Sequence, residues 1–120
     1  MKFERYWNTK KGGIIEFLFY KERNEYIGVC LTFDIIEEGK DIEKLKESVK
    51  EAAFLHLKIV NDKKLPDKLL NRYAPIEYWE KYFEFLSYLI AKKREEKIER
   101  PLPEMLNINY PLPVNACALA

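Results

Sequence analysis

Two runs in which side chains alternate between two faces, residues 14–21 and 26–33, restrict the fold more than any other feature. A period of two is that of a β-strand. In the first run one face carries Ile15, Phe17 and Phe19, and the other carries Ile14, Glu16, Leu18 and Tyr20. In the second run four apolar residues share one face: Ile27, Val29, Leu31 and Phe33. The four residues between the runs predict a tight turn, in which Asn24 is best able to adopt a positive φ angle. We therefore expect an antiparallel hairpin.

A long helix is predicted to pack on this hairpin. On the second run, Gly28 and Cys30 are small and lie opposite the apolar face, so another element can approach closely there. Residues 34–38 predict a short third strand, and Asp41 is the expected N-cap of a helix over about residues 42–61. Apolar and weakly polar residues recur along that helix at spacings of three and four. They are Ile42, Leu45, Val49, Ala52, Ala53, His56, Ile59 and Val60.

A second long helix, residues 75–98, opens at Pro75, where a missing N–H has no cost. Its first stripe consists of Ile76, Trp79, Phe83, Leu86 and Ile90, and the stripe beside it consists of Tyr78, Tyr82, Phe85 and Leu89. Together they cover more than half of the circumference, which is more than one sheet face can bury. We expect part of this helix to form an interface with a second copy or a partner. The expected interface residues are Tyr78, Trp79, Tyr82, Phe83, Phe85, Leu86 and Leu89.

At 120 residues the chain has room for one compact domain, which we place at residues 1–100. Residues 101–120 change character, because Pro-Leu-Pro occurs at 101–103 and again at 111–113, and no helical period is present. This segment predicts an extended, Pro-rich C-terminal arm that lies along a surface or stays mobile. The expected fold class is α+β: a small antiparallel sheet of three or four strands, a β-β-β-α unit, a second aromatic-rich helix, and the arm.

The chain shows no pattern that points to catalysis, and we expect that it is not an enzyme. His56 is the only histidine, and its place on the apolar stripe of the first helix indicates a core or interface residue. An acidic cluster around the turn, Asp34, Glu37, Glu38 and Asp41, is typical of solvated carboxylates. Cys30 and Cys117 lack metal-ligand spacing and are expected to be free thiols. No catalytic residue, metal or cofactor is therefore predicted.

Charge and hydropathy restrict the partners. The 21 basic and 20 acidic residues nearly cancel, which argues against nucleic acid as the main partner. Phe17, Phe19 and Phe33 could stack bases in principle, but their alternation favours core positions. We expect no signal peptide in residues 1–12 and no membrane span, because no run of about 18 apolar residues is present. These features predict a cytoplasmic protein.

Residues 14–60 resemble the N-terminal domain of the HicB-like antitoxin family. The stretches that carry the resemblance are 21–29 (KERNEYIGV), 39–43 (GKDIE) and 49–52 (VKEA). In that family they belong to a partial RNase-H-like β-β-β-α unit without nuclease activity. The chain departs from the family pattern in two places. Residues 32–36 replace a Pro-Gly-Cys-like loop, and residues 75–98 are too aromatic and acidic to serve as the usual DNA-binding segment.

The resemblance implies a non-catalytic protein that binds and masks a partner, such as a small toxin-like ribonuclease, and we expect a homo-oligomer. Two alternatives stay open. A nucleic-acid-binding regulatory protein would use the helix lysines Lys44, Lys46, Lys50 and Lys58, and its binding would fall steeply with salt. An oligomeric domain of unassigned role would self-associate without any other partner.

Overall fold

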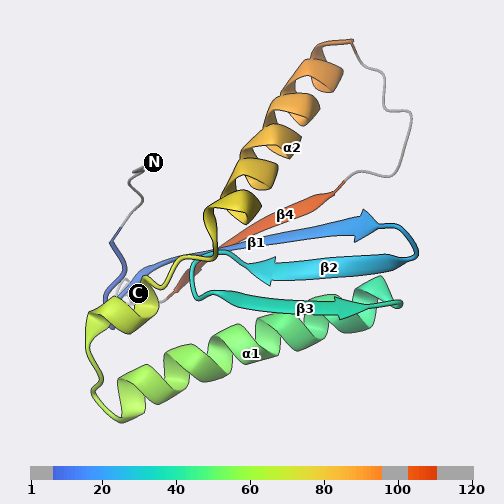
Figure 1. Ribbon diagram of the computed structural model, residues 1–120. Coiled ribbons are helices and arrows are strands. Elements are labelled where there is room, and N and C mark those ends of the chain that lie inside the picture. Colours follow the sequence, from blue (N-terminus) through green and yellow to red (C-terminus); the bar gives the residue numbers. More distant parts are fainter. Residues whose placement is uncertain (1–6, 96–102, 111–120) are drawn as a thin grey trace, which may run out of the picture.

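The computed structural model describes residues 7–95 and 103–110, and these build one four-stranded antiparallel sheet with a long helix on each face (Figure 1). The sheet order is β3-β2-β1-β4. The elements in chain order are β1 (Gly13–Glu22), β2 (Glu25–Cys30), β3 (Ile35–Gly39), α1 (Ile42–Asp62), the 3-10 helix η1 (Asp67–Leu70), α2 (Ile76–Glu95) and β4 (Glu104–Tyr110). The predicted α+β class, with a small antiparallel sheet and two helices, is confirmed.

The predicted hairpin is present, and its turn differs in one detail. β1 pairs with β2 from Phe17 opposite Cys30 to Glu22 opposite Glu25, so two residues connect the strands. Arg23 adopts the positive φ angle, 59°, and Asn24 does not, so the expectation for Asn24 is wrong. A positive φ at the first central position of a two-residue loop gives the backbone a twist that matches the strands.

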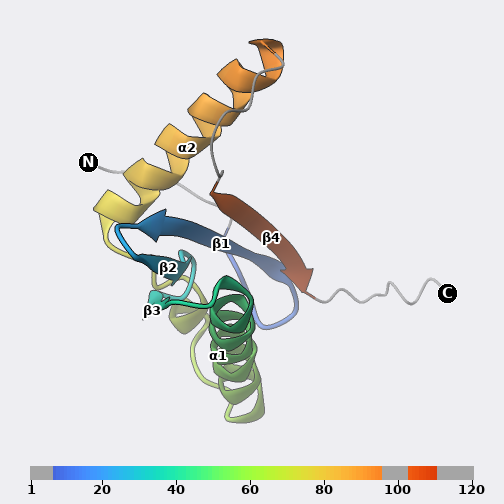
Figure 2. The same ribbon diagram turned by 90° about the vertical axis from the view of Figure 1, so that its right-hand side faces the viewer.

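The side chains of β1 alternate between the two faces of the sheet as predicted, and they belong to two separate cores. Ile15, Phe17 and Phe19 lie in the core under α1, whereas Leu18 and Tyr20 lie in the core under α2. Both sets are buried, which confirms that the phenylalanines of β1 are core residues. Figure 2 shows the two helices on opposite sides of the sheet.

The face expected for Phe33 is wrong, because β2 ends at Cys30 and residues 31–34 form a turn. Asp34 in this turn has a φ angle of 60°. The turn carries Phe33 to the α1 side of the sheet, where its ring centroid lies 4.8 Å from that of His56. Leu31, directly after the strand, lies in the α2 core with Ile27 and Val29 as predicted.

The first helix packs across β2 and β3, and its buried side is turned slightly from the predicted stripe. Leu45, Val49, Ala53 and Val60 are buried, whereas Ile59 is 39% exposed. The prediction that Ile59 belongs to the buried stripe is therefore wrong. Ile59 lies about 100° around the helix from Val60 and so falls at the border of the contact.

The N-cap prediction for Asp41 is confirmed and can be tested by mutation. Its Oδ1 accepts hydrogen bonds from the backbone N–H groups of Glu43 at 3.0 Å and Lys44 at 3.2 Å. We expect Asp41→Ala to lower the free energy of unfolding by about 1 kcal/mol, because two helix N–H groups lose their acceptor. Urea denaturation measures this change. Asp41→Asn, which keeps an oxygen acceptor, is the matched control and should lose far less; equal losses would contradict the capping role.

Residues 104–110, which the Pro-rich composition assigns to an arm outside the domain, form β4 inside the sheet. β4 pairs with β1 from Gly13 opposite Tyr110 to Phe19 opposite Glu104. Its Leu106 and Ile108 pack against the α1-side core. The physical reason is that residues 105–110 lack proline and alternate in side-chain direction, so they can complete the hydrogen bonds of β1. Residues 101–102 and 111–120 of the expected arm lie outside the described residues.

A buried asparagine ties the start of the sheet to the segment before α2. The Asn8 side chain, fully buried, accepts from the N–H of Ile14 at 2.9 Å and donates to the carbonyls of Ile14 and Leu70. The Asn8 N–H in turn donates to the side chain of Asn71 at 2.9 Å. The link fixes the end of η1, and thereby the chain that leads into α2.

Candidate functional site

The second helix is anchored to the sheet by its first turns. Trp79 is fully buried and Tyr82 is 6% exposed, in the core that they share with Leu18, Val29 and Leu31. The ring of Trp79 lies edge-on to that of Tyr82, with 5.9 Å between the ring centroids. Such edge-to-face pairs add specific geometry to a large buried area. The base of α2 is therefore packed closely against the sheet.

Beyond its anchor, α2 rises away from the sheet (Figures 1 and 2). Along the whole helix, from its first residue on, a set of large apolar side chains stays exposed. We call this set the α2 outer stripe: Ile76 (38% exposed), Phe83 (39%), Leu86 (38%) and Ile90 (55%). Their spacings of three, four and seven place them along one side of the helix. Phe83 also contacts the anchor, because its ring centroid lies 5.3 Å from that of Tyr82.

An acidic strip borders the outer stripe. Glu77, Glu80 and Glu84 are all exposed, and their spacings of three and four place them on the neighbouring side of the helix. Around the helix, the same carboxylates reach a cleft of about 470 Å³ that also contains Glu22. This side of α2 is therefore net negative, with these four carboxylates against the ammonium group of Lys81, although the chain as a whole is nearly neutral.

Tyr20 and Lys81 both line this cleft, and they lie against each other. The pKa of the Tyr20 hydroxyl is raised to about 12, mainly by burial and further by the negative charge of Glu22. Lys81 places its Nζ 5.0 Å from the centroid of the Tyr20 ring and 5.8 Å from that of Phe85. Lys81 thus stays against the aromatic rings, and the tyrosine stays protonated and neutral at physiological pH.

The structure divides the seven residues of the expected interface into three groups. Trp79 and Tyr82 are buried against the chain's own sheet, and Tyr78, Phe85 and Leu89 are partly buried. Phe83 and Leu86 are exposed, and the structure adds two residues beside them that the predicted set lacks, Ile76 and Ile90. The signal for these two is present in the sequence, since both belong to the first apolar stripe of the helix.

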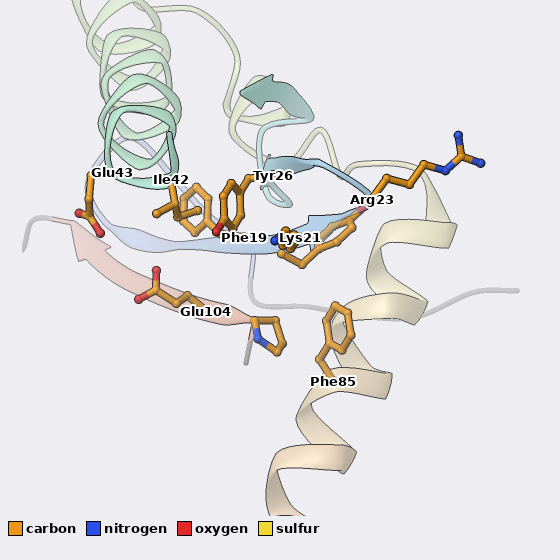
Figure 3. A pocket seen from close by; sticks show the side chains of 10 residues that line it. Phe19, Lys21, Arg23, Tyr26, Ile42, Glu43, Phe85 and Glu104 are labelled. Atoms are coloured by element: carbon orange, nitrogen blue, oxygen red, sulfur yellow. The ribbon is translucent and has the colours of Figure 1, made fainter. Parts of the chain in front are cut away.

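A second hollow, of about 620 Å³, lies at the hairpin end of the sheet (Figure 3). Its lining comes from β1, β2, α1, α2 and the start of β4 and includes Phe19, Lys21, Tyr26, Ile42, Phe85 and Glu104. Charges of both signs line it, and Arg23 points away from it in Figure 3. Glu104 is engaged by Lys46, whose Nζ lies 2.7 Å from the carboxylate. This mixed lining favours no single class of small ligand.

Comparison with protein-family models, with curated proteins and with solved structures gives no match to this chain. The HicB-like resemblance therefore stays a prediction from the residues that carry it. What supports a function is the geometry of the chain itself.

Three of the residues weighed as catalytic groups or metal ligands, His56, Cys30 and Glu38, contact other residues of the chain. His56 donates from Nε2 to the carbonyl of Leu69 at 2.6 Å and packs on Phe33. Burial raises the pKa of the Cys30 thiol to about 12, so it stays a neutral core residue. A hydrogen bond with Glu25, together with that residue's charge, raises the pKa of the exposed Glu38 carboxyl.

Two further observations concern residues 7–95 and 103–110. Within these ranges, no group of three or more histidine, cysteine or acidic residues is arranged to hold a metal ion. Neither helix in these ranges combines the length and the apolar character that a membrane crossing requires.

Proposed function

We propose that this chain is a non-catalytic protein-interaction module of the cytoplasm, similar to a HicB-like antitoxin, that binds and masks a small basic protein such as a toxin-like ribonuclease. The observation that carries the proposal is the α2 outer stripe beside its acidic strip. A large apolar surface next to concentrated charge of one sign suits a protein partner with a complementary apolar groove and a basic rim.

The stripe has the properties of a helix that is recognised in a groove. Its apolar residues recur at the spacings at which helical ligands present their anchors. Phe83 is the strongest anchor, because it is aromatic, exposed by 39% and already held in place by Tyr82. A side chain that is ordered before binding loses less entropy on binding. We therefore place Phe83 and Leu86 at the centre of the contact.

The acidic strip supports a basic partner. A ribonuclease must neutralise phosphates, so its substrate surface carries lysine and arginine. Glu77, Glu80 and Glu84 can pair with such residues, which would speed association and at the same time block the surface that binds RNA. Masking in this sense needs no catalytic group on the α2 side.

The nucleic-acid alternative is weakened by the way the α1 lysines are engaged. Lys46 lies 2.7 Å from Glu104 and 3.3 Å from Glu43, and Lys58 lies 2.6 Å from Asp62. Two of the four lysines on which that hypothesis relies are therefore in ion pairs with carboxylates, which lowers the positive potential that a phosphate backbone would meet.

The proposal is tested by affinity capture of the tagged chain from lysate of its native host, with nuclease treatment and native mass spectrometry. We expect a small basic protein in fixed ratio, retained after nuclease digestion. Phe83→Ser with Leu86→Ser should reduce its capture at least about tenfold, because two central apolar anchors are lost. Phe54→Ser with Leu55→Ser is the matched control, since these α1 residues are of the same types and at least as exposed, at 42% and 57%.

Three outcomes would contradict the proposal: capture that disappears on nuclease digestion, which supports the nucleic-acid alternative; equal effects of the α1 and α2 double variants; and recovery of the chain with no other protein. Circular dichroism of both double variants is the control that tests whether each is folded. A charge reversal, Glu80→Lys with Glu84→Lys, should slow association and weaken its salt dependence, which identifies the acidic strip as the basic partner's contact.

A further inference from the structure

The two edges of the sheet differ in a way that points to self-association. β3 forms one edge and β4 forms the other. A strand edge presents unpaired N–H and C=O groups that can pair with another chain, and charged residues in a short strand are a common protection. β3 has five residues and carries Glu37 and Glu38, whereas β4 has seven and carries one charge, at Glu104. The β4 edge is therefore the less protected of the two.

We propose that a second copy of this chain pairs with β4 in antiparallel orientation, on a two-fold axis at Asn107, so that the two sheets become one continuous eight-stranded sheet. In this register Leu106 lies opposite Ile108 of the second copy, and Met105 lies opposite its Asn109. Glu104 lies opposite Tyr110 of the second copy. About six to eight new backbone hydrogen bonds would form, two for each hydrogen-bonded pair along seven residues.

The side chains of β4 are self-complementary in this register. On the α1 side of the sheet, Leu106 and Ile108 are partly buried and already contact the core, and pairing would bring four such apolar side chains together. No like charges meet, because Glu104 is at the end of the strand and its carboxylate is paired with Lys46 at 2.7 Å. The same operation on β3, centred at Glu37, would place two carboxylates opposite each other, which is unfavourable.

The positions of the helices leave the β4 edge accessible. α1 packs on one face of the sheet, mainly over β2 and β3, and its Lys46 pairs with Glu104 at the start of β4. Figure 2 shows α2 rising over the opposite face while the outer edge of β4 points away from both helices. Two copies joined at β4 would keep both α2 outer stripes exposed on one face of the joined sheet. Such a dimer could bind two partners, or one partner with two sites, with the gain that bivalence brings.

The test uses the full chain and measures its mass over a range of concentrations by native mass spectrometry and light scattering. We expect a particle of twice the 14.4 kDa chain mass. Asn107→Lys should weaken dimerisation roughly fivefold or more, because it opposes two lysines at the axis. Asn107→Glu should do the same, and an equal mixture of the two variants should restore a dimer. Asn109→Lys is the matched control, since residue 109 is also exposed but would lie opposite Met105.

A covalent trap gives a second, independent readout. In a Cys117→Ser background, Asn107→Cys should form a disulfide-linked dimer under mild oxidation, because residues opposite each other on antiparallel strands have Cα atoms about 4.5–5.5 Å apart. Asn109→Cys should not form this disulfide. Residue 109 of one copy would be offset by four residues along the strand from residue 109 of the other, which separates their Cα atoms by about 13 Å.

Several results would overturn the inference: a monomer at all concentrations, a dimer that Asn107→Lys leaves unchanged, or equal crosslinking at positions 107 and 109. A dimer lost on Phe83→Ser with Leu86→Ser but kept in Asn107→Lys would place self-association on α2 instead. The inference is separable from the proposed function, because Asn107→Lys should leave capture of a basic partner by a single chain intact.

Discussion

Replacing Trp79 with alanine is expected to lower the free energy of unfolding by about 3–5 kcal/mol, the usual cost of removing a large buried aromatic side chain. Trp79 is fully buried, and its ring contacts those of Tyr73, Tyr82 and Phe83. It is the main apolar anchor between α2 and the sheet. Its removal would therefore leave a cavity at the contact that attaches α2 to the sheet. Single domains are stable by about 5–15 kcal/mol, so this loss can leave the chain barely folded.

Urea denaturation followed by far-ultraviolet circular dichroism measures this effect. Trp79→Phe, which keeps an aromatic ring in the cavity, should lose less and stay folded even if the alanine variant does not. Ile90→Ala on the same helix is the control, because Ile90 is 55% exposed and should change the free energy by at most about 0.5–1 kcal/mol. Equal effects of Trp79→Ala and Ile90→Ala would show that α2 is not anchored at its base.

The α2 helix also shows what an apolar sequence pattern can predict about burial and what it cannot. The apolar residues of α2 predict that one of its surfaces is buried and another is exposed. The pattern cannot decide which residues are buried and which are exposed, because Trp79 and Phe83 belong to the same stripe, one helical turn apart. Trp79 is fully buried in the core between α2 and the sheet, whereas Phe83, one turn further, is 39% exposed, although Phe85 beyond it still contacts Tyr20 of β1. The tilt of a helix against its sheet is set by tertiary packing and is not encoded in the period.

A similar limit explains β4 and the end of β2. The composition of residues 101–113 is dominated by two Pro-Leu-Pro copies, and these hide the short alternation between them. What makes 104–110 a strand is the free edge of β1, a partner more than eighty residues earlier in the chain. Phe33 also continues the alternation of β2, but the strand ends three residues before it. Local periods predict which segments can form strands; long-range pairing decides where each strand begins and ends.

The expectation that rests on the small size of Gly28 agrees with the structure. The small size of Gly28 predicts that another element approaches closely, and α1 does. A Cβ atom added at Gly28 would lie 2.9 Å from Cγ2 of Val49 on α1 and 3.0 Å from Cδ1 of Phe19 on β1. Such contacts are too close for carbon atoms, and neither neighbour is a flexible chain end, since both are buried in the α1-side core.

We therefore expect Gly28→Ala to lower the free energy of unfolding by about 1–3 kcal/mol, the usual cost of overpacking a core, even though alanine normally stabilises an extended segment relative to glycine. Gly39→Ala is the control with the opposite sign. A Cβ atom there would lie 3.8 Å from the side chain of Leu45, an ordinary contact, and the φ angle of Gly39 is not positive. That variant should be neutral or more stable by up to about 1 kcal/mol.

A double-mutant cycle with Val49→Ala separates overpacking from other causes. Removing the Val49 methyl that meets the new Cβ should reduce the cost of Gly28→Ala, so the two changes should be non-additive by at least about 0.5 kcal/mol. Urea denaturation of the four proteins in the cycle provides the measurement. Additive costs would mean that the loss in Gly28→Ala does not come from contact with Val49, and a stable Gly28→Ala variant would mean that α1 can shift away from β2 without loss. The close approach of helix and sheet at Gly28 would then not be what holds α1 in place.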